Sequence, residues 1–487
     1  MLARHVLNGA ILAVLAAVVP ISAQQAARPD VLFIAVDDLN DWIGVLGGHP
    51  QAKTPNIDLL AKRGMLFSNA HTAAPSCNPS RAALMTGVLP STSGVYSNAF
   101  DWRRAPALRD KPTLPQYLRG HGYKAMRGGK IYHAWSFTPD GFIGTTHPPS
   151  WDVGYPSLNR QMPEEIRPLY WPINRNPGLI YGMFDWAPVG AEDWATADGQ
   201  VVSWARRRLL EKRDEALFLA VGIYRPHLPW YVPQRYFDMH PIDKIELPAV
   251  LADDLDDVPR YARRGSSSRI HKWVVENDHW KKAVQGYLAS ISFADAMVGR
   301  LIDALDQSGK ADKTIVVLWS DHGWHLGEKG YWRKFSLWEE ATHVPLIVVA
   351  PGVTAAGSQT AKPVSLMDLY PTLCELAGVA VPKHTEGFSL VPLLKDANAQ
   401  WDHAAVTSWG YQNHSVRGER YRYIRYEDGG EELYDHRIDP HEHRNLAANP
   451  DLAARKAALA KHLPTLNARP LAGLRLLPGG LGAERIE

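Results

Sequence analysis

A cysteine opens the stretch of this sequence with the clearest chemical potential, which runs Ser76-Cys-Asn-Pro-Ser-Arg-Ala-Ala-Leu-Met-Thr-Gly87. Cys77 lies two residues before Pro79 and good helix formers follow, which predicts that Cys77 sits at or just before a helix N-terminus. The partial positive charge there favours an anion, and Arg81 can reach back over the same turn. The alternative is a buried thiol, or a disulfide with Cys374, the only other cysteine.

Further polar groups stand where four predicted strands end. They are Asp37-Asp38 after 31–36, Lys130 and His133 after 123–127, His227 after 216–222, and Asp321-His322 after 314–320. Ligands of α/β sheets bind beyond the carboxyl ends of the strands, so we expect these groups to share one site. Adjacent buried carboxylates are costly unless a cation neutralises them. Taken singly, each group could instead be a solvated turn, a cap or a structural histidine.

The elements that must position these groups follow from hydrophobic periodicity. Continuous apolar runs such as 31–36 are typical of strands buried on both faces, and they alternate with segments of helical period. This predicts an α/β fold with a large, doubly wound, mixed or parallel sheet flanked by helices. Helices are expected at 55–64, 113–122, 194–212, 279–307 and 368–377, and long ordered loops at 135–186 and 241–268.

The sequence changes character near residues 396–401. Two segments, 421–426 and 431–434, flank Glu-Asp-Gly-Gly and predict a β-hairpin, and residues 450–466 have helical period. We therefore expect a smaller C-terminal α+β unit with an antiparallel sheet. The predicted boundaries are a signal peptide at 1–23, a large catalytic domain at 28–398 and a C-terminal subdomain at 399–487.

Composition and the chain's beginning limit the function classes. An apolar stretch from Val6 to Val19 and small residues up to Ala23 are typical of a secretory signal peptide, and an uncleaved anchor is the alternative. The 53 basic residues almost balance the 51 acidic ones, which argues against nucleic-acid binding as the main function. We expect a secreted or periplasmic protein with no membrane association after signal cleavage, and Cys374 as an inert core residue.

Several motifs together resemble one family. They are Val-Asp37-Asp38-Leu-Asn, Cys77-Asn-Pro-Ser-Arg81, Gly-Lys130-Ile-Tyr-His133, Arg225-Pro-His227, Ser-Asp321-His322-Gly-Trp-His-Leu-Gly-Glu, Trp-Arg-Lys334, Thr-His-Val-Pro-Leu346 and Glu-Leu-Tyr-Asp435. The chain resembles a type I sulfatase of the alkaline phosphatase superfamily, in the branch that contains iduronate-2-sulfatases. Nearly the whole chain after the signal peptide takes part in this resemblance.

The resemblance implies a chemistry for each position. Cys77 is expected to be oxidised to formylglycine by a maturation enzyme, a formylglycine-generating enzyme or its equivalent. Ca²⁺ is expected to bind Asp37, Asp38, Asp321 and the residue derived from Cys77, with His322 as a ligand or a close neighbour. The remaining expected roles are charge neutralisation by Arg81, Lys130 and Lys334, a base at His133, a proton donor at His227, and substrate contacts by Arg225, Asn413 and His414.

The function implied is hydrolysis of sulfate esters on sulfated saccharides, with a 2-O-sulfated uronic acid as the expected unit. Two alternatives stay open. One keeps the fold but acts as a phosphodiesterase or phosphonate hydrolase, and the other is a non-catalytic protein that binds sulfated glycans. His414 has a second interpretation too, as part of a polar loop that pins the C-terminal hairpin to the large domain.

Overall fold

The structure, a computed structural model, describes residues 28–133, 146–263 and 268–471 of the 487-residue chain. The predicted signal peptide at 1–23 lies outside the described residues. So do parts of the two segments expected to form long loops.

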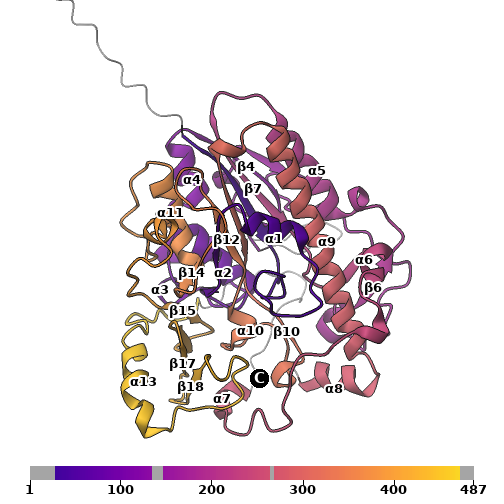
Figure 1. Cartoon of the computed structure of the whole chain (residues 1–487), viewed down its shortest axis with the longest axis vertical. Helices are drawn as coiled ribbons and strands as arrows, with labels where there is room; N and C mark the ends of the chain where they lie inside the picture. Colours follow the sequence, from indigo (N-terminus) through magenta and orange to yellow (C-terminus); the bar gives the residue numbers. More distant parts are fainter. Residues whose placement is uncertain (1–27, 134–145, 264–267, 472–487) are drawn as a thin grey trace, which may run out of the picture.

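One eight-stranded sheet forms the centre of the molecule (Figure 1). β1 (Asp30–Val36) pairs in parallel with both β7 (Ala216–Ile223) and β9 (Thr314–Ser320), and β4 (Tyr123–Gly129) pairs in parallel with β7. The full order is β13-β2-β12-β9-β1-β7-β4-β5, where β2 is Met65–Phe67, β5 Val153–Tyr155, β12 Leu346–Val349 and β13 Ser358–Thr360. Because β12 is antiparallel to both β9 and β2, the sheet is mixed, as predicted.

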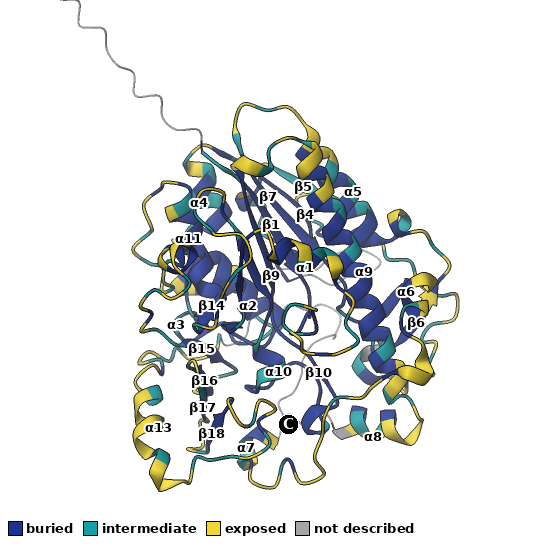
Figure 2. Ribbon diagram, in the orientation of Figure 1, coloured by how far each residue is buried: buried dark blue, intermediate teal, exposed yellow. Residues whose placement is uncertain are grey.

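Helices cover both faces of this sheet. Alternate residues of β1 enter two different cores, with Leu32 in one and Phe33 in the other. The first core lies under α1 (Pro55–Ala61), α5 (Ala197–Leu210) and α9 (Trp280–Gln307). The second lies under α2 (Cys77–Thr86), α4 (Leu114–Gly120) and α11 (Leu369–Leu376). Figure 2 shows the strands buried between these two layers, so the doubly wound architecture is confirmed.

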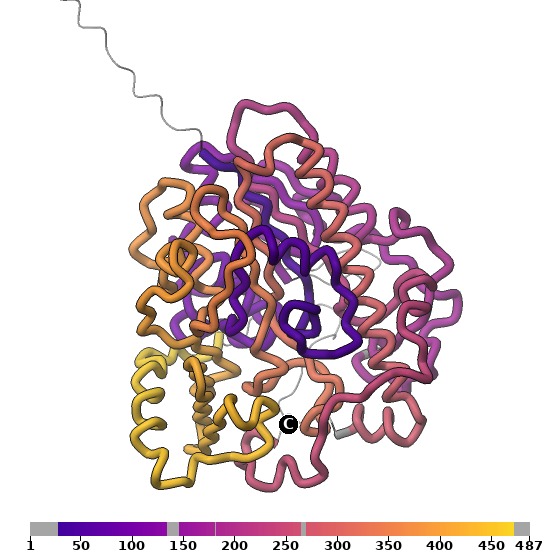
Figure 3. The backbone as a smooth tube through the Cα atoms, in the orientation of Figure 1, coloured from indigo at the N-terminus to yellow at the C-terminus, as the bar shows by residue number. Residues whose placement is uncertain are grey.

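A second, antiparallel sheet forms the C-terminal part, drawn in yellow to orange in Figure 3. Its order is β15 (Ala405–Ser408), β16 (His414–Arg417), β17 (Tyr421–Arg425) and β18 (Glu431–Asp435), with α13 (Ala453–Ala460) packed nearby. The smaller α+β unit is therefore confirmed, while the boundary at 398/399 stays a prediction. β15 joins the two parts, because Ser408 N donates to Ala73 O (2.9 Å) and Thr407 Oγ1 donates to Thr72 O (2.5 Å).

Short elements complete the fold. The predicted loop at 135–186 is partly wrong, because it contributes β5 to the sheet edge and leads into β6 (Trp186–Val189), which pairs with β8 (Trp230–Pro233). The other short pairs are β3 (Ala70–His71) with β14 (Val364–Ser365), and β10 (His325–Leu326) with β11 (Trp332–Arg333). Short helices are α3 (Pro90–Ser93), α6 (Gln234–Asp238), α7 (Arg260–Arg263), α8 (Ser268–Glu276), α10 (Glu339–Thr342) and α12 (Val391–Lys395). Among the helices of the described residues, none is both long and apolar enough to cross a membrane.

Candidate active site

Two carboxylates follow β1 and are fully buried. Asp38 adopts a left-handed backbone conformation, with φ of 60°, which turns the chain directly after the strand. Its N–H donates to Asp321 Oδ1 (3.1 Å) at the end of β9, and the Tyr287 hydroxyl on α9 donates to its carbonyl (2.8 Å). The ends of two neighbouring strands are thereby joined, and Asp37, Asp38 and Asp321 converge as predicted.

Arg81, in the second turn of α2, holds these strand ends together. Its Nη2 donates to Asp37 Oδ1 (2.9 Å), its Nε to Asp321 Oδ2 (2.8 Å), and its Nη1 to the carbonyl of Lys130 (2.7 Å). Burial disfavours the charged guanidinium, but Asp321 and Asp37 outweigh burial and raise the pKa of Arg81. Three of its nitrogens are thus directed at the protein, so Arg81 assembles the site as well as adding positive charge.

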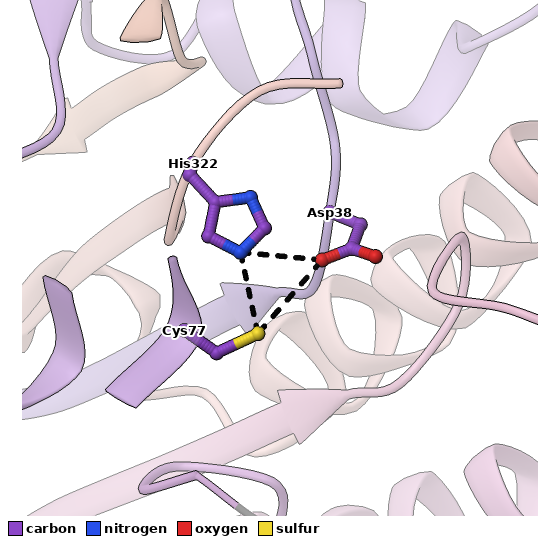
Figure 4. A group of neighbouring side chains, drawn as sticks. All are labelled: Asp38, Cys77 and His322. Carbon is purple, nitrogen blue, oxygen red and sulfur yellow. Dashed lines mark hydrogen bonds and ion pairs between the residues drawn. The ribbon is translucent and has the colours of Figure 1, made fainter. Parts of the chain in front are cut away.

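Cys77, the first residue of α2, lies at the centre of the site. Its Sγ is 3.2 Å from Lys334 Nζ, 3.3 Å from His322 Nε2 and 3.7 Å from Lys130 Nζ. Asp38 Oδ1 is 4.0 Å from the same sulfur, and Figure 4 shows Asp38 and His322 directed at Cys77. Burial alone would raise the pKa of the Cys77 thiol, but the two lysines and His322 hold it well below its usual range.

Neither cysteine forms a disulfide, since both Cys77 and Cys374 are free. Cys374 lies on the buried face of α11, where burial raises the pKa of its thiol to about 12. The expectation of an inert core residue at this position agrees with that environment.

Two histidines approach the cluster with different electrostatic settings. His133 hydrogen-bonds to the Cys77 side chain, and burial lowers the pKa of its imidazole to about 4. His133 is therefore neutral at neutral pH, as a proton acceptor must be. His227 lies 3.8 Å from Asp38 Oδ2 through Nε2, while its Nδ1 lies 2.7 Å from the carbonyl of Leu228. Its Nε2 thus faces the site, which suits a proton donor.

The carboxylates fit a hard divalent cation. Ligand atoms of Asp38, Cys77 and His322 lie within 4.8 Å of one another, and so do those of Asp37, Cys77 and Asp321. Asp38 Oδ2 is buried and has no hydrogen-bond partner, which is an orphaned acceptor of the kind that a cation satisfies. Oxygen donors of this number suit Ca²⁺ better than a softer ion. Burial raises the pKa of Asp321 to about 7, and a neighbouring cation would keep that carboxylate ionised.

The three residues predicted to contact substrate are bonded within the protein. Arg225 donates through Nε and Nη2 to the carbonyl of Tyr231 (3.3 and 3.2 Å) and pairs with Glu165 (3.3 Å). Asn413 Nδ2 donates to the hydroxyl of Tyr261 (3.1 Å). These bonds fix the segments on which Arg225 and Asn413 lie, and their contact with substrate stays a prediction.

His414 is held in the same way. Its Nδ1 lies 2.9 Å from Ser408 Oγ and its Nε2 lies 2.7 Å from Asn467 Oδ1, and the residue is 1% exposed. Both ring nitrogens therefore have protein partners. This geometry favours the structural interpretation, in which His414 fastens the C-terminal sheet, over a contact with sugar.

Some residues that build the site were not predicted. Tyr287 accepts from Asn40 N (3.0 Å) and donates to Asp38 O, and Ser320 Oγ accepts from Leu39 N (3.0 Å). Asn98 Oδ1 accepts from both Ser76 Oγ (2.7 Å) and Asn78 N (2.8 Å), which flank the cysteine. Each acts across a long sequence separation, and no local pattern distinguishes it from an ordinary core or loop residue.

Comparison with known proteins now identifies the family. The sulfatase family model matches residues 29–379, and a model described as the N-sulphoglucosamine sulphohydrolase C-terminal region matches residues 327–469. The chain therefore belongs to the sulfatase family, a group of hydrolases, and the predicted resemblance is confirmed.

Individual relatives agree with that assignment. A sulfatase of Formosa agariphila is 38% identical over 457 residues, with 91% of this chain and 88% of the relative covered. Human iduronate 2-sulfatase is 32% identical, with 72% and 70% covered, and the choline-sulfatase of Rhizobium meliloti is 30% identical, with 87% and 83% covered.

Solved structures share the fold. A 2-O GAG sulfatase superposes with a TM-score of 0.65 at 26% identity, covering 88% of this chain and 90% of that one. A phosphonate monoester hydrolase of Agrobacterium radiobacter superposes with a TM-score of 0.69 at 23% identity, covering 90% and 95%, and shows the fold alone.

Proposed function

We propose that this protein hydrolyses sulfate esters of an anionic saccharide, with a 2-O-sulfated uronic acid as the unit attacked. The observation that carries the proposal is the setting of Cys77, whose sulfur lies 3.2 Å from Lys334 Nζ and 3.3 Å from His322 Nε2 at a helix start. A nucleophile at this position is surrounded by cationic donors that offset charge on a sulfate group as the transition state forms.

Formylglycine made from Cys77 would supply a hydrated aldehyde, whose two hydroxyls provide a nucleophile for sulfur and a means of releasing sulfate. Asp37, Asp38, Asp321 and His322 would hold calcium, which would supply positive charge near the sulfate group. These two groups are part of the proposal, together with the maturation enzyme that converts the cysteine. Three carboxylates and an orphaned Asp38 oxygen support the metal.

The chain's own residues then have distinct tasks. Lys130 and Lys334 bind the sulfate oxygens and stabilise the charge that accumulates on them. His227 protonates the oxygen of the departing alcohol as its bond to sulfur breaks. Neutral His133 accepts a proton at its imidazole from the second hydroxyl of residue 77, which would allow sulfate to be released.

The substrate class rests on relatives, which point in more than one direction. Human iduronate 2-sulfatase and the 2-O GAG sulfatase favour a uronate, whereas the choline-sulfatase is nearly as similar. Phosphonate esters stay the second candidate, because their hydrolysis is the alternative reaction that the sequence left open on this fold. Secretion or export to the periplasm, which the predicted signal peptide favours, would place the protein where polymeric saccharides occur.

The decisive experiment measures sulfate release from a panel of defined esters by protein in which the aldehyde has been verified by peptide mass spectrometry. The panel contains iduronate 2-sulfate, an unsaturated 2-O-sulfated uronate disaccharide, a 6-O-sulfated glucosamine, choline sulfate, an aryl sulfate and a phosphonate monoester. We expect the highest kcat/KM on a 2-O-sulfated uronate. A higher kcat/KM on the phosphonate, or binding of sulfated sugar without turnover, would contradict the proposal.

A further inference from the structure

The side chain of Gln161 is completely buried and satisfies three consecutive backbone groups. Its Oε1 accepts from the N–H of Ile131 (2.9 Å) and from the N–H of Tyr132 (2.8 Å). Its Nε2 donates to the carbonyl of His133 (3.2 Å). One amide thus replaces the hydrogen bonds that a neighbouring strand would provide, at the point where β4 has ended.

The segment held in this way carries two residues of the candidate active site. Lys130 is fixed independently of Gln161, because its side chain pairs with Asp37 and its carbonyl accepts from Arg81 Nη1 (2.7 Å). The carbonyl of His133 accepts from Gln161 Nε2, and the N–H groups of the two residues before it donate to Gln161 Oε1. A displaced amide would therefore shift the main chain that carries the His133 imidazole.

Gln161 is itself rigidly placed. Arg127, a buried residue of β4, donates to the carbonyls of Tyr155 (3.3 Å), Ser157 (2.6 Å) and Leu158 (3.1 Å), and so orders the turn that leads to Gln161. Arg127 and the segment 131–133 belong to one continuous piece of chain. The position of the amide relative to His133 is consequently set by β4 itself.

We propose that Gln161 is a positioning residue for His133, the residue that accepts the proton of the second hydroxyl of residue 77 in the proposed function on which this inference rests. Gln161 touches no reacting atom. It fixes the main chain from which the imidazole projects, and so keeps the ring within hydrogen-bonding reach of residue 77.

Two variants and one matched control separate positioning from general stability. Gln161→Leu removes all three hydrogen bonds at similar volume, whereas Gln161→Glu keeps an acceptor for the two N–H groups. Asn176 is the control, because it is a buried amide whose Nδ2 donates to the carbonyls of Leu179 and Phe184 (both 2.9 Å) and whose Oδ1 accepts from Leu179 N. Asn176→Leu loses equivalent hydrogen bonds without touching the segment 131–133.

The test is a double-mutant cycle with His133→Ala, measured as kcat at saturating substrate on protein with verified aldehyde content. We expect Gln161→Leu to lower kcat by about 10–100-fold when His133 is present but less than about 3-fold when it is absent. We expect KM to change little and Gln161→Glu to retain more kcat than Gln161→Leu. Asn176→Leu is expected to lower Tm in both backgrounds and to leave kcat within about 3-fold of its parent.

Equal losses of kcat from Gln161→Leu with and without His133, or an equal loss from Asn176→Leu, would overturn the proposal. If Gln161→Leu does not fold, the same comparison is made with Gln161→Glu, which loses the hydrogen bond to the His133 carbonyl. The decrease in kcat that this variant causes must again depend on the presence of His133. If the wild-type protein turns over only the phosphonate ester, the proposed function fails and the cycle is measured on that ester, so the two failures are distinguishable.

Discussion

Lys334 and Asp38 form an ion pair directly beside the sulfur of Cys77, with Nζ 2.7 Å from Asp38 Oδ1 and 3.2 Å from Sγ. The lysine reaches this position because its neighbours Arg333 and Phe335 both have left-handed backbones, with φ of 81° and 78°. Such conformations cost free energy in residues other than glycine and occur where surrounding structure fixes them. Here Phe335 N donates to Pro75 O (3.2 Å), which fastens the turn to the segment that precedes Cys77.

Replacing Lys334 tests its part in catalysis. Lys334→Ala removes a buried cation next to the reacting group, so kcat/KM on the preferred ester should fall by about 10²–10³-fold. Lys362→Ala is the control, because Lys362 pairs with Glu419 at the surface and should be dispensable. Steady-state kinetics of both variants settle the matter, and a loss below about 3-fold for Lys334→Ala would assign the lysine to structure alone.

The nucleophile is tested by Cys77→Ser. A serine hydroxyl can attack sulfur but lacks the second hydroxyl that expels sulfate, so this variant should release at most one equivalent of alcohol and keep a sulfated peptide. Stopped-time assays and peptide mass spectrometry measure both outcomes. Cys374→Ala, on the buried face of α11, should retain the parent kcat, and sustained turnover by Cys77→Ser would contradict the two-hydroxyl mechanism.

Metal removal tests the carboxylate cluster. Dialysis against a calcium chelator should abolish activity and lower Tm, because Asp37, Asp38 and Asp321 lose their shared counter-charge. Asp38→Asn should reduce bound metal measured by plasma mass spectrometry. Glu442→Gln is the informative control, because Glu339 and Glu442, which cluster with His436, are already paired with Arg422, so metal content should not change.

Asp198 is expected to hold the turn that carries His227. Its carboxylate accepts from Tyr224 N (2.6 Å) and Arg225 N (3.0 Å), and burial raises its pKa to about 7. Asp198→Ala leaves both N–H groups unpaired and should lower kcat by about 10-fold, whereas Asp198→Asn keeps an acceptor and should stay close to the parent. Equal effects of the two variants on kcat would argue against this role.

A pH effect on stability is expected from Asp295, which caps α1 by accepting from Asn56 N (3.0 Å) and Ile57 N (2.8 Å). Burial raises the pKa of this carboxyl to about 6. Between about pH 4 and pH 6 the folded protein binds more proton here than the unfolded chain, so stability falls as pH rises, by up to about 3 kcal/mol. Denaturant unfolding should show that the free energy of unfolding of Asp295→Asn increases relative to that of wild type as the pH rises across that window. A difference that does not depend on pH would refute this.

Local pattern predicted much of the scaffold. The segment 314–320 is β9 residue for residue, because seven consecutive buried residues of mainly β-branched and aromatic type permit little else. The helix at Cys77 also begins where proline and helix formers indicated. β5 was missed, because its three residues have no periodicity and gain their strand character only from pairing with β4. The helix expected at 450–466 is shorter, since α13 spans only Ala453–Ala460.

The site was predictable where residues act through their own chemistry. The carboxylates, Lys130 and the histidines at strand ends were found because charge at such positions requires a partner, whereas Lys334 was indicated only by the family resemblance. Gln161 and Tyr287 were not found, because a neutral side chain reveals its role only through the distant backbone that it binds. His414 shows the converse, since its imidazole looks reactive in sequence but is bonded to Ser408 and Asn467, and its contact with substrate stays a prediction.

Strands β9, β1, β7 and β4 lie side by side in that order, and each is followed by one part of the candidate active site: Asp321, Asp37-Asp38, His227 and Lys130. Neighbouring strands are held about 4.8 Å apart by their hydrogen bonds, so the spacing between the four parts is fixed by the sheet. The peripheral turns and the C-terminal α+β unit are not under this constraint. After gene duplication, substitutions there could therefore change which alcohol of the ester is accepted, while the groups at the strand ends keep their arrangement.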